Sequence, residues 1–498
     1  MRILMVYPEF PDTFWSFKHA LKFIHKKVSN PPLGLMTISS LLPAEWERRL
    51  VDTNIHKLKR EDIRWADMVF ISAMDVQRAS VKEIVEQVKK NQKMIVAGGP
   101  LFTGEYADFP DIDVFVLNEG EITLPPFLDD LQHNREIKRV YSSSDYADIT
   151  MSPVPDINLI KMNEYDCMSV QFSRGCPFHC NFCNVTALLG HFPRTKTAAQ
   201  VIAEVDQLYA AGWRRNIFFV DDNFIGNKKV IKNEILPALI EWKKDKEGCH
   251  FITEASINMA DDPELMDLMA RAGFVNIFIG IETPNSESLV ECEKSQNTNR
   301  DMIHNINLIQ NHGMQVMAGF IVGFDNDPPD IFDQMINFIQ RSGIVTAMVG
   351  LLQAPFGTKL YSQLQSEGRI LNEMSGDNSD GTTNIVTRIE QKKLRSGYFK
   401  IMQEIYSPRM LYPRIKTFLQ QFTPKSEPVF LQVNEILAFL RSVVLMGFNF
   451  KEAGYYWRLL LWTLRNDIKK FPMAVTLTIY GYHFRTITQK NMRLLSVS

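Results

Sequence analysis

Apolar and polar positions alternate along the first 145 residues in a pattern that predicts strands separated by helices. Short apolar runs are followed by longer amphipathic stretches, and several runs end at turn-forming or polar residues. The runs lie at residues 3–7, 49–51, 68–72, 94–97 and 114–117. This order is typical of parallel βαβ units, so we predict a Rossmann-like α/β domain over residues 1–145.

A polar segment rich in Ser, Asp and Pro comes next, and we predict that residues 146–164 are a linker. A second series of apolar runs lies at residues 168–172, 216–220, 251–255, 276–280, 316–322 and 347–352. The intervals leave room for one crossover helix each, which predicts a partial (β/α)6 barrel over residues 165–390. The remainder, residues 391–498, has the pattern of helices with aromatic faces, so we expect a helical C-terminal domain.

The composition excludes several classes of protein. Hydrophobic residues make up 45% and charged residues 22%, and the formal net charge is −2, so we expect no nucleic-acid partner. Six cysteines are too few and too scattered for a disulfide framework, which favours a reducing compartment. The start, MRILMVYPEF, is typical of a strand rather than a secretory signal. We therefore expect a cytoplasmic protein.

The end of the chain is chemically distinct. Residues 408–498 contain 13 Lys and Arg against 4 Asp and Glu, a local charge of +9. Aromatic residues accompany this charge: Tyr455, Tyr456, Trp457, Trp462, Tyr480, Tyr482 and Phe484. The mixture suits peripheral contact with an anionic membrane surface, here the inner face of the membrane. The alternative is a helical cap whose aromatic residues are core and whose basic residues are solvated.

The strongest motif is the stretch SRGCPFHCNFCN at residues 173–184. It places Cys176, Cys180 and Cys183 close together directly after the first barrel strand, with Phe182 before the third cysteine. Clustered thiolates need a metal centre, because they repel one another and oxidise easily. Zinc with His179 as the fourth ligand is one alternative. A [4Fe–4S] cluster, which would keep one iron free to bind a small molecule, is the other.

The motif resembles the signature of the radical S-adenosylmethionine (SAM) superfamily. This resemblance implies that the three cysteines hold a [4Fe–4S] cluster and that SAM binds the free iron. Reductive cleavage of SAM would then give a 5′-deoxyadenosyl radical. A flavodoxin or ferredoxin would supply the electron.

Other candidate residues for SAM follow the ends of the barrel strands. The second strand ends with Asp221, Asp222 and Asn223, the third carries Glu254 and Ser256, and the fourth ends with Glu282. Alternation along a strand would put Glu254 and Ser256 on one face, and a carboxylate inside a barrel needs a cation or a donor. Either SAM or an internal arginine could supply that partner.

Glycines in the fifth strand and a turn after the sixth complete the candidate SAM site. Gly319, Ile321 and Gly323 resemble the family's glycine-spaced strand that passes beneath the adenine, and Gln353 lies at the turn. In such a strand two glycines would let the backbone approach a flat ring. A glycine in a strand is as often a packing accommodation.

In the first domain, Gly98 and Gly99 follow the fourth apolar run, and Asn118, Glu119 and Gly120 follow the fifth. These loops would lie at the carboxyl ends of parallel strands, where open sheets bind ligands. The alternative for Gly98 and Gly99 is a plain tight turn.

A Rossmann-like domain ahead of such a barrel resembles the cobalamin-binding branch of radical SAM enzymes. The matching stretches are residues 30–42, 97–103 and 118–121. No Asp-x-His-x-x-Gly motif is present; Asp52 and His56 echo it without its spacing. The resemblance therefore implies cobalamin without a histidine ligand from this domain, or a domain that has lost cobalamin.

Stretches near the start (residues 7–23), the middle (residues 351–361) and the end (residues 459–484) resemble the group that contains the hopanoid C-2 methylases. The implied activity is cobalamin-dependent radical SAM C-methylation of an unactivated sp3 carbon in an apolar, hopanoid- or isoprenoid-like lipid. The alternatives are a radical SAM enzyme that couples, cyclises or rearranges its substrate without methylation, and a zinc-binding module with a degenerate barrel.

Overall fold

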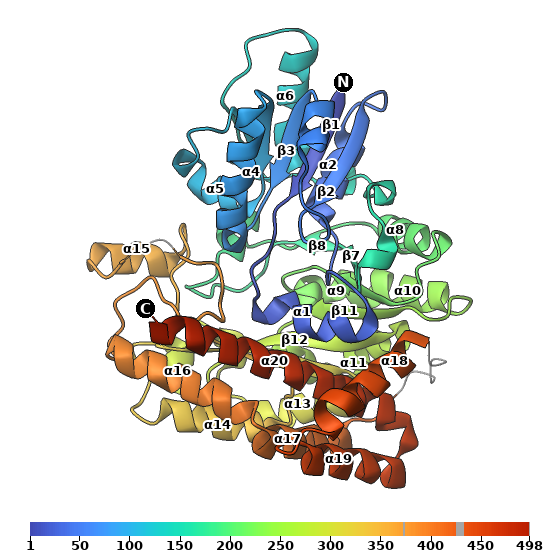
Figure 1. The fold of residues 1–498 in the computed structure, drawn as a ribbon, viewed down its shortest axis with the longest axis vertical. Coiled ribbons are helices and arrows are strands. Elements are labelled where there is room, and N and C mark those ends of the chain that lie inside the picture. The colour runs from blue at the N-terminus through green and yellow to red at the C-terminus, as the bar shows by residue number, and fades with distance from the viewer. Residues whose placement is uncertain (372–373, 425–432, 498) are drawn as a thin grey trace.

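The first domain is a parallel sheet with helices on both faces (Figure 1). The structure, a computed structural model, describes residues 1–371, 374–424 and 433–497. The strands, in the order β2-β1-β3-β4-β5-β6, are β1 (Arg2–Tyr7), β2 (Glu47–Asp52), β3 (Met68–Ser72), β4 (Met94–Gly98), β5 (Val114–Val116) and β6 (Val140–Tyr141). All five neighbouring pairs are parallel, as the βαβ pattern predicts.

Side chains alternate between two cores because both faces of this sheet are covered. Helices α3 (Arg60–Trp65), α4 (Arg78–Lys90) and α5 (Pro100–Glu105) pack on one face, and α2 (Leu33–Leu41) and α6 (Gly120–Gln132) on the other. The strand order reverses between β1 and β3, which opens a crevice at the carboxyl ends of the strands.

The second domain is an open barrel of six parallel strands. The order is β7-β10-β11-β12-β13-β14, and β7 and β14 are its two edges. The bounds are β7 (Met168–Val170), β10 (Asn216–Phe219), β11 (His250–Glu254), β12 (Phe274–Glu282), β13 (Gln315–Val322) and β14 (Ala347–Leu351). Each predicted apolar run therefore overlaps a strand, and all neighbours pair in parallel.

Helices follow the barrel strands as crossovers. They are α8 (Ala198–Ala210), α9 (Lys228–Val230), α10 (Leu236–Lys243), α11 (Pro263–Ala272), α12 (Ser286–Glu291), α13 (Met302–Asn311), α14 (Ile331–Ser342) and α15 (Lys359–Ser366). The segment after β7 carries the three cysteines and a small antiparallel hairpin, β8 (Ser173–Arg174) with β9 (Arg194–Thr195), which encloses α7 (Val185–Leu189).

The C-terminal helices pack together beside the barrel and share its core (Figure 1). They are α16 (Gln391–Ile405), α17 (Pro408–Gln421), α18 (Val433–Ser442), the π-helical turn η12 (Val443–Gly447), α19 (Ala453–Asn466) and α20 (Phe471–Val497). In the described part of the chain, no helix combines the length and apolar character needed to cross a bilayer.

The last helix also holds a segment from the beginning of the chain. After β1 the chain leaves the first sheet and forms η1 (Phe14–Ser16), α1 (Lys18–Leu21) and η2 (Lys22–Ile24) beside α20 (Figure 1). Phe14 stacks on Phe484 with ring centroids 3.9 Å apart. The His483 ring nitrogen Nε2 lies 2.9 Å from the Phe14 carbonyl oxygen. Residues 7–23 and 459–484, the start and end stretches that resemble the family, are thus in direct contact.

Candidate active site

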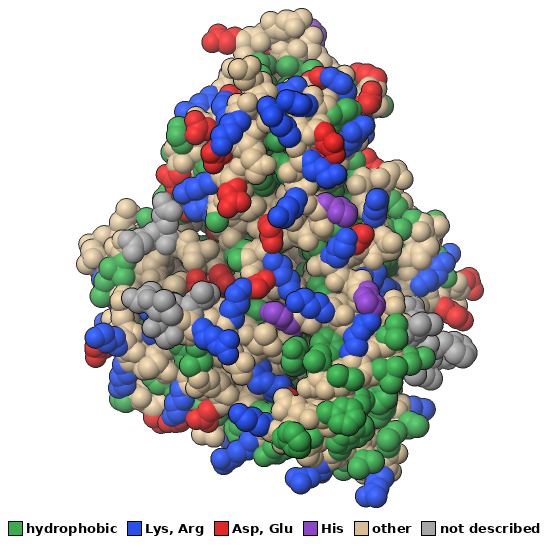
Figure 2. Space-filling model, in the orientation of Figure 1, with side chains coloured by type: hydrophobic (Ala, Val, Ile, Leu, Met, Phe, Trp, Pro, Cys, Tyr) green, Lys and Arg blue, Asp and Glu red, His purple; other side chains and the backbone are tan. Residues whose placement is uncertain are grey.

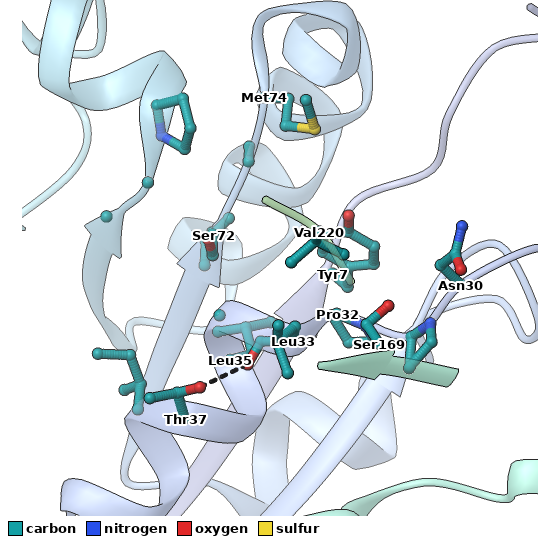
Figure 3. A pocket seen from close by; sticks show the side chains of 18 of the residues that line it. Tyr7, Asn30, Pro32, Leu33, Leu35, Thr37, Ser72, Met74, Ser169 and Val220 are labelled. Carbon is teal, nitrogen blue, oxygen red and sulfur yellow. Dashed lines mark hydrogen bonds between the residues drawn. The ribbon is translucent and has the colours of Figure 1, made fainter. Parts of the chain in front are cut away.

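One large cavity lies between the first sheet and the barrel. Its volume is about 810 Å³, within the usual range for ligand pockets. Its walls include Tyr7 and Ser72 from the first sheet and Ser169 and Val220 from the barrel side (Figure 3). Helix α2 forms a further wall, to which its first turn contributes Leu33 and Leu35 (Figure 3). The cavity extends to Arg174, Leu188 and Leu189, which flank the cysteine loop.

The predicted glycine loops form the first-domain wall of this cavity. Gly99 has φ 99°, and a Cβ atom there would lie 2.7 Å from Ser72 Oγ. A Cβ atom on Gly98 would lie 2.6 Å from the Val116 carbonyl oxygen. Asn118 adopts φ 62° and donates its backbone N–H to Thr103 Oγ1 at 3.1 Å. Gly98, Gly99 and Asn118 line the cavity, and the close packing at both glycines also agrees with a tight turn.

Glu119 also borders the cavity, but its carboxylate is occupied by arginines of the barrel domain. Arg194 binds both of its oxygens, at 2.8 and 2.9 Å, and Arg174 lies 3.1 Å from one of them. Arg174 also makes a two-point pair with Glu121, at 2.7 and 3.0 Å. Although burial alone would raise the pKa of Glu121, the Arg174 guanidinium lowers it to about 2. Glu119 and Glu121 thus tie the first sheet to the cysteine hairpin.

Histidine is absent from the described residues that line the cavity. Asp52 is buried and accepts a hydrogen bond from the Tyr165 hydroxyl at 2.9 Å, whereas His56 is exposed. Of this partial Asp-x-x-x-His echo, Asp52 is therefore a structural link between the domains.

The three predicted cysteines lie on one loop above the barrel. Each is partly buried as a free thiol, and burial raises the pKa of Cys183 to about 12 and that of Cys176 above its ordinary value. Such thiols become thiolates when a positively charged centre binds them. In the ranges that the structure describes, no three His, Cys, Asp or Glu side chains converge as ligands of one metal ion.

Lys294 is the cation of this site, and sequence reasoning missed it. Its Nζ lies 2.6 Å from Glu282 Oε1, and both side chains are largely buried. Burial would lower the pKa of Lys294, but Glu282 and the nearby Cys180 outweigh it and raise the pKa. Glu282, at φ 64°, therefore has a lysine partner where the sequence left SAM or an arginine open. The pair is packed so closely against Gly280 that a Cβ there would collide with it.

Asn223 connects two other predicted residues. Its Nδ2 lies 3.9 Å from Cys176 Sγ, and its Oδ1 accepts from the Ser256 backbone N–H at 3.3 Å. Strand β11 ends at Glu254, so Ser256 begins the following turn and the predicted strand alternation does not reach it. Asp221 is fully buried and accepts from the Ser173 hydroxyl at 2.5 Å, so it supports the start of the cysteine segment.

Asp222 and Glu254 are carboxyl groups at the mouth of the barrel. Asp222 keeps accessible surface although protein surrounds it on most sides, and burial raises its pKa to about 6. Burial, followed by repulsion from Asp222 and Asp221, raises the pKa of Glu254 to about 8, while Lys294 opposes this shift.

The remaining predicted residues differ in their surroundings. Gly319 faces the barrel interior, since a Cβ there would lie 3.0 Å from the Phe278 ring. Gly323 has φ 110° and its Cβ position faces Leu394, away from that ring. Ile321 and Phe182 belong to one small apolar cluster.

Gln353 and Gln296 are among the buried amides of the described residues whose side-chain oxygens have no hydrogen-bond partner. Gln353 follows the end of β14, and Gln296 places its Nε2 3.7 Å from Cys180 Sγ. Sequence patterns gave no signal for Gln296.

Glu254 predicts a pH dependence of stability. Between its ordinary pKa of 4.5 and the folded value of about 8, the folded protein binds a proton that the unfolded chain releases. Its stabilising contribution is therefore complete below about pH 4.5 and is lost as the pH rises through 8. We expect Glu254→Gln to gain thermal stability relative to the unsubstituted apoprotein as the pH is raised from 5 to 9. The control is Glu241→Gln, an exposed site on α10, and a pH-independent difference for Glu254→Gln would contradict the assignment.

The first domain is doubly wound and shares a cavity with an open six-stranded barrel. Three cysteines come directly after the first barrel strand. Together these features define a radical SAM enzyme with an N-terminal cofactor domain. The radical SAM superfamily profile matches residues 170–339, and the B12-binding domain profile matches residues 25–128. A domain of unknown function matches residues 358–495. The chain belongs to the radical SAM enzymes with a B12-binding domain, the family that includes hopanoid C-2 methylase.

Similar proteins cover almost the whole chain. An uncharacterised methyltransferase of Synechocystis is 38% identical over 97% of this chain and 91% of its own length. The hopanoid C-2 methylase of Rhodopseudomonas palustris is 33% identical over 83% of this chain and 78% of its own. The cobalamin-dependent SAM radical enzyme OxsB, solved with aqua-cobalamin and SAM bound, shares the fold at a TM-score of 0.62 and 14% identity, covering 100% of this chain and 80% of that chain. The cofactors of this family are SAM, a [4Fe–4S] cluster and cobalamin.

Proposed function

We propose that this enzyme is a cobalamin-dependent C-methyltransferase that modifies an unactivated sp3 carbon of an apolar, hopanoid- or isoprenoid-like substrate. The observation that carries the proposal is the shared cavity. It is bounded by the cofactor loops of the first sheet, by strands β7 and β10, and by the residues that flank the cysteine loop. A methyl carrier and a radical generator must both reach one substrate carbon, and this cavity gives them a common space.

The first domain offers a fitting place for cobalamin. Gly98, Gly99, Asn118 and Gly120 provide a backbone wall, and Asn30 adds a buried Oδ1 with no partner among the described residues. Glu119 takes part through the ion pairs that hold this wall against the barrel. When bound, cobalamin supplies the methyl group, and the cluster with SAM supplies the radical that removes a hydrogen atom from the substrate.

The barrel residues would hold the cluster and SAM. Cys176, Cys180 and Cys183 are the thiolate donors, and Lys294 lies close enough to offset part of their negative charge. Glu254 and Asp222 are carboxyl groups suited to the ammonium and ribose of SAM, and the Gln353 acceptor suits an N–H or O–H donor. Asn223 and Ser256 would position the loop, and Gly319, Ile321 and Gly323 the strand beneath the adenine.

The apolar substrate class rests on the lining of the cavity. Trp15, Leu33, Ile38, Leu189 and Phe218 contribute apolar surface, and Trp15 is fixed by its Nε1–H, which lies 2.9 Å from Met348 Sδ. Hopanoid C-2 methylase, named for a lipid substrate, is a relative that matches 83% of this chain. We further propose a flavodoxin or ferredoxin as electron donor and the cytoplasmic face of the membrane as the place of action.

Comparative mass analysis tests this function. Lipid extracts from cells with and without the active protein should differ in one compound class by a single CH2, and the added carbon should carry label from methyl-labelled methionine. Full activity in protein that contains no cobalt would refute the methyltransferase proposal.

Gly34 on α2 allows the cobalamin assignment to be tested separately. It lines the cavity, and a Cβ built on it would meet no atom within 4 Å. We expect Gly34→Phe to fold with full iron content but to lose cobalt by at least about tenfold, because the ring would occupy the cavity. Gly34→Ala is the matched control and should keep its cobalt. Equal cobalt in both variants, measured after anaerobic purification with B12, would place cobalamin elsewhere.

A further inference from the structure

The most exposed apolar surface of the described chain lies on the C-terminal helices. Among the described residues, 22 large hydrophobic side chains are exposed, and ten of them fall within residues 436–468. We call this set the apolar face; its members are Ile436, Leu440, Val444, Leu445, Phe448, Phe450, Trp457, Leu461, Leu464 and Ile468. Figure 2 shows a concentration of hydrophobic side chains over the region of α18 and α19. Isolated exposed apolar residues need no explanation, but a contiguous patch marks an interaction site.

Helical geometry joins these residues into two adjacent stripes. Ile436, Leu440, Val444 and Phe448 follow one another at four-residue intervals along α18 and η12. Trp457, Leu461, Leu464 and Ile468 form a second stripe along α19 and the turn after it. The Trp457 indole N–H donates to the Gly447 carbonyl oxygen at 3.0 Å, so the stripes meet there.

The opposite sides of both elements are already used by the core. Met446 is fully buried under η12, and Tyr456, Leu459 and Leu460 are buried under α19. Both elements are thus apolar on the inner and the outer side. A helix with that pattern is covered on both sides in its working state. Folding of this chain covers only the inner one.

Charge identifies what would cover the outer side. Residues 436–470 contain six Lys and Arg and two acidic residues. One acid, Glu452, is buried and paired with Arg485 at 2.6 Å, whereas Lys451, Arg458, Arg465 and Lys469 are exposed. Apolar and aromatic side chains interspersed with cations match the boundary between anionic headgroups and acyl chains. A second copy of the chain would bring two positive faces together, which is unfavourable.

We propose that the apolar face docks the enzyme on an anionic lipid bilayer, lying in the interface without spanning it. This surface shares only Trp457 with the aromatic residues that the sequence suggests. Tyr456 and Phe484 are buried, and Tyr480 and Trp462 pack against the core, so most of those aromatic residues act as a cap. The membrane-contacting residues are instead the aliphatic side chains together with Phe448, Phe450 and Trp457.

The docked face adjoins the segment that closes the cavity. Arg441 of α18 donates to the carbonyl oxygens of Lys22 and Phe23 in η2, and η1 of the same segment carries Trp15 into the cavity wall. The proposed function makes the substrate apolar, and docking would then bring the cavity close to the phase in which that substrate dissolves. The docking itself requires no particular substrate.

Vesicle co-sedimentation of the full-length, anaerobically purified protein tests the docking. We expect binding to phosphatidylcholine vesicles that contain phosphatidylserine, and weaker binding to phosphatidylcholine alone. Phe448→Glu/Leu461→Glu should lower the partition coefficient by at least about tenfold. The matched control, Met151→Glu/Tyr106→Glu, adds the same charge at exposed apolar sites elsewhere and should bind like the unsubstituted protein.

Three results would overturn the proposal. They are no binding of the unsubstituted protein, equal loss of binding in both double variants, and a dimer in light scattering that Phe448→Glu/Leu461→Glu dissociates without any vesicle binding. Circular dichroism and iron content confirm that each variant is folded. Since this assay contains no substrate, its failure would leave the methyltransferase proposal intact, and failure of the methyl-transfer test would leave the docking result intact.

Discussion

Replacement of Cys180 by Ala should leave a folded protein with little iron and no detectable product. A three-cysteine site has no spare donor, so loss of one thiolate removes a bond to the cluster itself. Changes to residues that merely support metal ligands lower metal affinity or activity by about 10- to 100-fold. Because Cys180 is itself a proposed ligand, we expect activity to fall by more than about 100-fold. Iron and sulfide analysis, together with production of methionine from SAM under reducing conditions, measures the effect.

Cys249→Ala is the control for this change. Cys249 is also a free thiol but is fully buried in the barrel core, away from the cysteine loop. It should keep its iron and its cleavage of SAM. Cys292 is unsuitable as a control, because it is buried near Cys180 and Lys294. Unchanged iron in Cys180→Ala would refute the cluster assignment and leave the zinc alternative or a different ligand set.

Replacement of Lys294 by Met should give the largest loss of stability among single substitutions in the barrel mouth. The change leaves Glu282 buried without its cation and removes the positive charge that faces Glu254 and the cysteines. Loss of one partner from a buried ion pair costs about 3–5 kcal/mol. Urea unfolding of the anaerobic protein, followed by circular dichroism, measures the change in the free energy of unfolding.

The control for Lys294→Met is Lys359→Met, which breaks an exposed pair with Glu293. That variant should stay within about 1 kcal/mol of the unsubstituted protein. The double variant Glu282→Gln/Lys294→Met should recover part of the loss, because it leaves no uncompensated charge. Equal losses of unfolding free energy in Lys294→Met and Lys359→Met would show that the Glu282–Lys294 pair stabilises the fold no more than an exposed pair does.

Much of the fold follows from local patterns in the sequence. Parallel strands buried on both faces form continuous apolar runs, which is why residues 68–72 and 316–322 could be recognised. Strand β6 could not be recognised, because a strand of two residues, Val140 and Tyr141, is too short to show a pattern. The cysteine spacing predicted a site on one local loop, since all three cysteines lie between β8 and α7.

The surroundings of that site could not be predicted in the same way. Lys294 lies beyond α12, and only the fold brings it to Glu282 and Cys180. Arg194 meets Glu119 from another domain, 75 positions away in the chain. Such pairs depend on where distant segments converge, and no local periodicity reports that. The apolar face was hidden for the converse reason, because α19 has apolar residues on both its buried and its exposed sides and only packing shows which side is covered.

The paired arginines and glutamates between the two domains restrict how this architecture can be rearranged. Glu119 and Glu121 come from the first domain, whereas Arg174 and Arg194 come from the hairpin that encloses the cysteines. A chimaera that takes its first domain from a distant relative would replace the two glutamates of these ion pairs but keep the two arginines. Transplantation should therefore succeed only when the hairpin travels with the donor domain, so that both halves of the enzyme are exchanged as a matched set.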